Sequence, residues 1–111
     1  MIACISLLRK RSEIDQVDFL QHWLGPHVAI ARQLLGLRGL VAFSREDAQA
    51  AICDGIGIAW FDDIAQADAA FSYGPVCELL REDRPKFVTD VQSFLAQEHV
   101  VVPPHWLSKS R

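Results

Sequence analysis

The 111-residue sequence has few cysteines, no long apolar run and no dense cluster of one charge. Its three cysteines, Cys4, Cys53 and Cys77, are odd in number and widely spaced, which argues against a disulfide framework and against a CxxC metal or redox motif. This usage favours a reducing, intracellular compartment. No apolar segment approaches the roughly 20 residues that span a bilayer, and no secretory signal pattern opens the sequence. We therefore expect one domain, residues 1–111, soluble and cytoplasmic, without a membrane partner.

The charge pattern argues against nucleic acid as a partner. The 14 acidic and 11 basic residues give a formal net charge of -3 and are scattered along the chain. Phosphate binding needs clustered Lys and Arg, and the one basic cluster, Arg9-Lys10-Arg11, is short enough to be a solvated strand end. A Gly-rich phosphate loop and a GxSxG elbow are also missing. We expect no cofactor.

Apolar residues make up 50% of the chain, enough for a core without disulfides or metal. Short apolar runs predict four strands, at residues 2–8, 39–46, 55–61 and within 91–102. The polar, Ala-rich stretch after the second run, to Asp54, is expected to be a loop or a strand extension. In the third strand, Gly57 and Ala59 form a face of small residues that leaves room for a bulky group.

Helix signals separate these strands. Asp15 is a candidate N-cap, with Ile14 and Phe19 placed as a hydrophobic staple. Asp63 opens a later helix in the manner of a capping box, and Ile64, Ala67 and Phe71 are expected to form its apolar stripe. A further short helical piece is expected to begin at Pro75, run through Leu79 and Leu80, and end before Pro85.

The first helix is interrupted by Gly25-Pro26, in the stretch FLQHWLGPHVAI. Pro26 has no N–H for the carbonyl four residues back, so the helix must either kink or restart with Pro26 as its first residue. A second helical piece is then expected to reach about Leu35 and stop at Gly36. A restart at Pro26 would place His27 in the first turn of a helix, where the positive end disfavours a protonated ring. A simple bend around the sheet is the alternative.

The element order is βαβ followed by βαβ. This order predicts an α+β, ferredoxin-like split βαβ fold, with a four-stranded antiparallel sheet and both helices on one face. The other sheet face carries many apolar residues and must be buried. A second copy of the chain would cover it, giving a homodimer built as a dimeric α+β barrel.

His27 is the candidate catalytic residue. With Phe19 and Trp23 it falls on one helix side, directed toward the sheet, and an imidazole can act as general acid or base near neutral pH. An apolar cavity would lower its pKa and favour the neutral base. The alternative is a core histidine bonded to backbone carbonyls or water. His22 and His27 lie about 140° apart on an ideal helix, so a metal site is not expected.

Candidate ligand-binding residues surround that position. His22 and Trp23 flank it in the sequence, while Trp60 and Phe94 lie in the third and fourth predicted strands. Aromatic rings at a pocket would suit a flat or apolar compound, although buried Trp is more often part of a core. The pair Glu98-His99 cannot point to one side of a strand, and a solvated strand end is its simpler interpretation.

The sequence resembles the EthD family of dimeric α+β barrel proteins. FLQHWLGPHVAIARQLLGLRGL is similar to the family pattern of Phe, then Tyr or His followed by Trp, a His three residues on, and a PGLR-like turn. DGIGIAWFDDIAQADAAF and FLAQEHVVV resemble the family's third and final strand regions. Here the turn is LGLR, without Pro, and Leu40 stands where an aromatic residue, often Tyr, is common.

The resemblance implies a ferredoxin-like dimer with a pocket between helices and sheet, and it places an acid/base histidine at His27. Members are associated with degradation pathways that use oxygenases. The first hypothesis is a cofactor-independent enzyme or oxygenase-pathway accessory acting on a small apolar, lactone-like or aromatic compound, with an oxygenase as candidate partner. The second is a non-catalytic module that binds a small molecule or a partner. The third is a haem protein with His27 or His99 as ligand.

Overall fold

The computed structural model describes residues 1–47 and 52–107. Four strands run along the sheet: β1 (Ile2–Lys10), β2 (Gly39–Ser44), β3 (Gly55–Phe61) and β4 (Val88–Gln97). The helical segments are α1 (Gln16–His22), η1 (Trp23–His27), α2 (Val28–Ala31), α3 (Ile64–Ser72), α4 (Pro75–Asp83) and η2 (Arg84–Lys86). Residues 48–51, within the expected loop before Asp54, lie outside the described residues.

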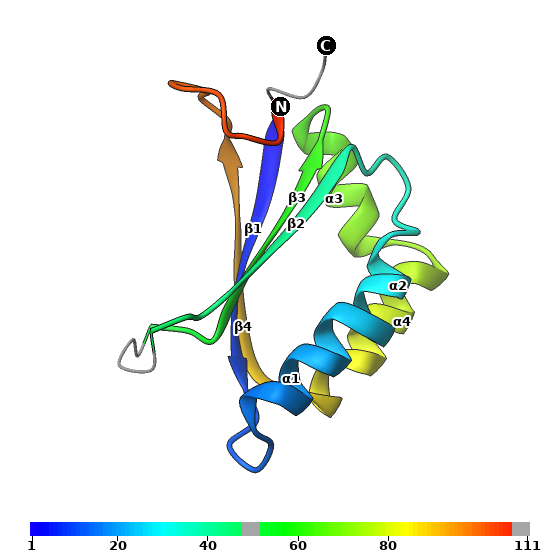
Figure 1. The fold of residues 1–111 in the computed structure, drawn as a ribbon. Coiled ribbons are helices and arrows are strands. Elements are labelled where there is room, and N and C mark those ends of the chain that lie inside the picture. The colour runs from blue at the N-terminus through cyan, green and yellow to red at the C-terminus, as the bar shows by residue number, and fades with distance from the viewer. Residues whose placement is uncertain (48–51, 108–111) are drawn as a thin grey trace.

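The four strands form one antiparallel sheet in the order β2-β3-β1-β4. The helices α1 to α4 form a layer on one face of this sheet, and none of them covers the other face (Figure 1). The ferredoxin-like α+β fold predicted from the sequence is therefore confirmed. The fourth strand begins earlier than predicted and ends at Gln97, so Val100, Val101 and Val102 follow it and are exposed.

Side chains alternate between the two sheet faces, and the strand register fixes which ones share a face. Cys4 lies opposite Ala59, on the side of the helices, whereas Ile5 lies between Ile58 and Phe94 on the outer face. The same register makes the outer face largely apolar, with Ile5, Leu7, Val41, Phe43, Ile56, Ile58, Trp60 and Phe94.

The C-terminal segment contacts one end of this outer face. The indole of Trp106 packs against Trp60 and Phe43, with ring centroids 6.4 and 6.5 Å apart respectively. Part of the predicted tail is thus placed on the chain's own sheet, and residues 108–111 lie outside the described residues.

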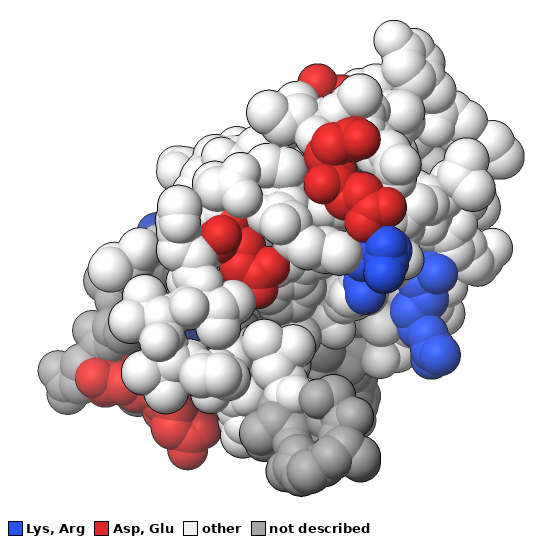
Figure 2. All heavy atoms as spheres, turned by 90° about the horizontal axis from the view of Figure 1, so that it is seen from above, with Lys and Arg blue, Asp and Glu red and all other residues white. Residues whose placement is uncertain are grey.

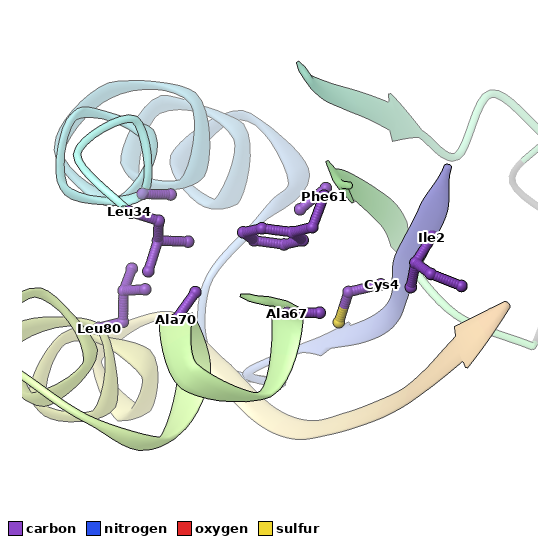
Figure 3. Close-up of a cluster of buried hydrophobic side chains, with 9 residues drawn as sticks. Ile2, Cys4, Leu34, Phe61, Ala67, Ala70 and Leu80 are labelled. Carbon is purple, nitrogen blue, oxygen red and sulfur yellow. The ribbon is translucent and has the colours of Figure 1, made fainter. Parts of the chain in front are cut away.

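The core lies between the sheet and the helices. Cys4 and Phe61 extend from the strands toward Leu34 and Leu80 of the helical layer (Figure 3). A second cluster, nearer the start of the first helix, joins Phe19 and Trp23 to Leu8, Phe87 and Val88. Phe19 and Phe87 are at most 1% exposed, and burial of each such ring contributes about 2–3 kcal/mol.

Both predicted helix caps form, whereas the apolar stripe predicted for α3 differs in one residue. Asp15 accepts a hydrogen bond from the Asp18 amide at 2.8 Å, and Asp63 accepts one from the Gln66 amide at 2.8 Å. Ile64, predicted for the apolar stripe of α3, is 54% exposed, while the stripe includes Ala67 and Ala70. The first turn of α3 therefore points its apolar residue to solvent.

The first helix does not restart at Pro26. It continues through η1, a π-helical turn with Pro26 inside it, and the Val28 amide reaches the carbonyl of Trp23, five residues back. A wider turn absorbs the missing proline N–H without breaking the helix. His27 is consequently inside a continuous helical segment, so the predicted helix N-terminus beside it is wrong. The segment also ends at Ala31, short of Leu35, and Gly36 follows with φ +84°.

The small face of β3 accommodates the indole of Trp23, the bulky group for which the sequence left room. A Cβ added to Gly55 would lie 2.5 Å from Cζ3 of Trp23, whereas one added to Gly57 would lie 3.8 Å from Cζ2. The first distance is a clash and the second is ordinary van der Waals contact. Gly55 thus permits the close approach of helix and strand.

The surface has no continuous basic face in the view of Figure 2, where acidic and basic side chains form separate small groups. Across residues 1–47 and 52–107, no helix is both long and apolar enough to cross a membrane.

We predict that Gly55→Ala destabilises the fold by about 1–3 kcal/mol, because Trp23 cannot move without disturbing the core around it. Gly57→Ala is the matched control, because Gly57 lies on the same face of β3 and beside the same indole. It should change the free energy of unfolding by no more than about 1 kcal/mol. Urea unfolding followed by circular dichroism measures both. Equal effects of the two substitutions would contradict the close packing of Trp23 on Gly55.

Candidate functional site

The site centres on a buried carboxylate that the sequence analysis missed. Asp83, in the last turn of α4, is 5% exposed, although a helix C-terminus disfavours negative charge. One sequence signal could have identified it. Asp83 follows Val76 and Leu80 at steps of four and three residues, so it falls on the helix side that those apolar residues turn toward the core.

Both histidines of the first helix contact this carboxylate. Nε2 of His22 lies 3.0 and 2.9 Å from the two carboxylate oxygens of Asp83, and Nδ1 of His27 lies 2.8 Å from Oδ2. The rings of His22 and His27 also pack against Phe87, with centroids 4.9 and 4.8 Å away. Two helical segments distant in the sequence are thereby joined at one point.

The π-helical turn explains why the two histidines meet. On an ideal helix residues five apart diverge, but a turn closed by hydrogen bonds between residues five apart brings them to one side. The expected divergence of His22 and His27 is therefore wrong. Within the described part of the chain, no group of three or more His, Cys, Asp or Glu side chains is placed to hold a metal ion.

The carboxylate determines where the proton of His27 lies. An ionised carboxylate only accepts hydrogen bonds, so Nδ1 of His27 must carry the hydrogen that faces Asp83. In the neutral ring, Nε2 then keeps its lone pair. No residue within 1–47 or 52–107 forms a hydrogen bond with this Nε2, which leaves it available to a bound molecule.

Burial and the hydrogen bond between His27 and Asp83 have opposite effects on the pKa of each of these two residues. Burial lowers the pKa of His27 below its ordinary value of 6.5, and the hydrogen bond to Asp83 offsets only part of that decrease. Burial alone would raise the pKa of Asp83, but the hydrogen bonds from His27 and His22 outweigh it and hold this pKa below its ordinary value. At neutral pH the pair is a neutral imidazole beside an ionised carboxylate.

His27 lies at the wall of a cavity between the sheet and the helical layer, with a volume of about 100 Å³. Trp23 forms part of the same wall, and the small side of β3 contributes Gly57 and Ala59. Nearly all other lining residues are apolar, among them Leu8, Val28, Ala31, Leu34, Leu40, Leu80 and Phe87. The cavity therefore places one basic nitrogen beside largely apolar side chains, as ligand sites commonly do.

The remaining candidate residues lie elsewhere. Trp60 and Phe94 belong by register to the outer sheet face, opposite the helices, although Phe94 also borders a second hollow. They do not share the cavity of His27. Glu98 and His99 follow the end of β4, where the Glu98 amide bonds to the Met1 carbonyl and His99 is exposed.

Fold and site together define a ferredoxin-like α+β protein with a histidine-carboxylate pair at an apolar cavity. No family model and no curated protein sequence matches the chain. Solved structures do: an ethyl tert-butyl ether D (EthD) family protein from Bacillus halodurans C-125 has a TM-score of 0.76 at 18% identity, covering 89% of this chain and 99% of that one. The predicted likeness to the EthD family is thus confirmed in the fold.

Two further structures share the fold. A dimeric protein of unknown function with a ferredoxin-like fold, from Bacteroides fragilis, has a TM-score of 0.69 at 8% identity and covers 87% of this chain and 95% of that one. SnoaB, a cofactor-independent oxygenase from Streptomyces nogalater, has a TM-score of 0.69 at 12% identity, with coverage of 93% and 97%. At these identities the comparisons establish architecture.

We predict that His27 titrates below pH 6.5 and that its neutral ring carries hydrogen on Nδ1. Imidazole NMR across a pH series reports both properties. Asp83→Asn should lower the pKa of His27 further, because the carboxylate that favours its charged form is gone. A pKa at or above 6.5 in the wild type, or hydrogen on Nε2 alone, would contradict the arrangement.

Proposed function

We propose that this protein is a small enzyme that works without a cofactor on a small apolar, lactone-like or single-ring aromatic compound, with His27 as general acid/base. The observation that carries the proposal is the free Nε2 of His27 at an apolar cavity, with Nδ1 bonded to Asp83. A carboxylate in this position fixes the tautomer and stabilises the imidazolium that forms when the ring takes a proton. His22 also holds Asp83, through contacts of its Nε2 with both carboxylate oxygens.

The cavity narrows the class of substrate. Pockets for drug-sized ligands measure about 300–1,000 Å³, whereas this one measures about 100 Å³. A single ring or a small lactone suits such a space, and a fused polycyclic compound does not. The haem hypothesis fits poorly for the same reason, since a porphyrin exceeds the cavity beside His27. His99, the other candidate ligand, is exposed beyond β4.

The comparison with SnoaB supports the proposal at the level of architecture. That protein carries out an oxygenation without a cofactor on the same fold, so the fold is compatible with such chemistry. The reaction itself must come from the site. Here the site offers proton transfer at one nitrogen, as an isomerisation or as the first step of a cofactor-free oxidation. An accessory role beside an oxygenase would use the same cavity for binding.

We also propose that two copies of the chain pair through their outer sheet faces. The face is apolar and is not covered by α1 to α4 (Figure 1), and Phe94 and Phe43 on it are 53% and 44% exposed. Large exposed apolar patches indicate interaction surfaces. Structures that share this fold, including the one from Bacteroides fragilis, are described as dimeric.

The enzymatic proposal predicts that His27→Gln lowers kcat/KM by about 100-fold or more, because general acid/base catalysis contributes about that much. A panel of small lactones and single-ring phenols is screened with wild-type protein, and the variant is compared on any compound that turns over. The wild-type rate should rise with pH and level off above the pKa of His27, which lies below 6.5.

Two outcomes would overturn this function. Unchanged turnover in His27→Gln, with intact circular dichroism, would remove the acid/base role. Saturable binding of a panel compound without turnover in either protein would instead support the non-catalytic binding module. Glu98→Gln is the matched control, since Glu98 lies beyond β4 and away from the cavity.

The dimer predicts that Phe94→Glu yields a monomer at micromolar concentration in sedimentation analysis. A charge buried within a paired apolar face costs free energy unless it finds a partner, while in the single chain this half-exposed position tolerates it. Val17→Glu, at a 61% exposed position of α1 in the helical layer, is the control and should remain dimeric. A wild-type monomer would refute pairing through the sheets.

A further inference from the structure

Among the residues that line the His27 cavity, Arg84 is the one with a permanent charge. It follows Asp83 directly, at the junction of α4 and η2, where the chain turns back toward β4. Within the described part of the chain, its guanidinium forms no hydrogen bond or ion pair with another residue. Arg84 is exposed to solvent, so its guanidinium is free to bind an anion that enters the cavity it lines.

A second hollow adjoins the first and shares Arg84 with it. Its volume is about 280 Å³, and it lies between β1, β4 and the helices α3 and α4. Both hollows are bordered by Cys4, Ser6, Phe71, Leu80 and Arg84. Arg84 therefore stands where the smaller cavity beside His27 meets the larger second hollow.

The second hollow is also lined by the charged residues Asp68 and Arg81, but only Arg84 is a cation without an ion-pair partner among the described residues. Arg81 is paired with Glu78 one turn earlier on α4 and also contacts the sulfur of Cys77 at 3.3 Å. Asp68, on α3, is the acidic residue of the wall. The hydroxyls of Ser6 and Ser93 bond to each other at 2.9 Å. None of these groups borders the His27 cavity except Ser6.

Arg84 also affects the ionisation of His27. Its charge contributes to the decrease in the pKa of His27, after the larger effect of burial and against the effect of Asp83. The guanidinium is therefore close enough to favour a neutral ring before reaction. When His27 removes a proton from a neutral molecule, that molecule becomes an anion, and a cation at the same cavity stabilises it.

We propose that Arg84 binds the negative charge of the substrate, and that the substrate is a small ring compound with an acidic hydroxyl, a phenol or an enol, held as its conjugate base. The inference rests on the proposed function, since His27 supplies the deprotonation: the O–H bond breaks, the proton moves to Nε2, and the electron pair stays on the substrate oxygen. Arg84 then donates hydrogen bonds to that oxygen.

The test uses 4-nitrophenol, whose phenolate absorbs in the visible range, and nitrobenzene as a neutral analogue of similar shape. At alkaline pH, where free nitrophenol is already ionised, Arg84→Met should weaken its binding by about 10- to 100-fold, the range for one charge-assisted hydrogen bond. Arg84→Lys keeps the charge and should restore most of the affinity. Nitrobenzene binding should change less than about twofold in each variant, a value on the scale of surface substitutions.

The matched control is Arg81→Met, on the same helix, which borders only the second hollow. It should leave nitrophenolate affinity within about twofold of wild type. Equal nitrophenolate affinity of wild type and Arg84→Met would overturn the inference. An equal loss of nitrobenzene affinity in Arg84→Met would also overturn it, because it would indicate that Arg84 acts through packing. Wild-type protein that binds neither compound would overturn it as well.

A second measurement separates this inference from the proposed function. At mildly acidic pH, bound nitrophenol should show the phenolate band in the wild type and lose it in His27→Gln, because His27 accepts the proton. If the band is missing in the wild type while alkaline binding still depends on Arg84, the acid/base role of His27 fails and the anion site stands. If the band is present in both the wild type and Arg84→Met, the anion site fails and the base stands.

Discussion

The carboxylate of Asp83, buried between two imidazoles, is the contact on which the arrangement of this protein depends. A buried charge is tolerated only when it is hydrogen-bonded, and here the two hydrogen-bonding histidines come from the first helical segment while the charge comes from α4. Removing either histidine leaves the carboxylate with a weaker partner, and removing the carboxylate releases both rings. The same contact that fixes the helices to each other fixes the tautomer of His27, so the stability of the helical layer and the chemistry of the cavity share one origin.

The π-helical turn is what makes this contact available. A regular helix with a proline in it would kink and would separate His22 from His27, whereas the wider turn keeps the axis continuous and rotates the two rings to one side. Gly25 and Pro26 therefore set the geometry of the site without contacting Asp83. In the sequence these two residues predict an interruption of the helix. In the structure they belong to the same π-helical turn as His27.

The order of elements, three of the four strands and both acidic caps could be predicted because they depend on local patterns: short apolar runs, and Asp15 and Asp63 three residues before an amide. The apolar placement of His27 followed from helical spacing in the same way. Asp83 could not be found without asking why an acidic residue falls on an apolar helix stripe, because its partners are 56 and 61 residues away. The π-helical turn and the early start of β4 depend on tertiary packing, which the local pattern does not contain.

The contact between Trp23 and the glycines of β3 has a consequence for how such a cavity could change over time. The indole and the missing side chain at Gly55 occupy one shared volume, although the two positions are far apart in the sequence. A larger residue at position 55 is compatible with this fold when the residue at position 23 is smaller. We therefore expect the sizes of these two residues to be inversely related among related proteins. Each such exchange would move the wall beside His27 while its hydrogen bond to Asp83 stayed in place. Cavity shape and proton chemistry are thus separable features of this chain, and related proteins could differ in the molecules they accept without altering the group that reacts.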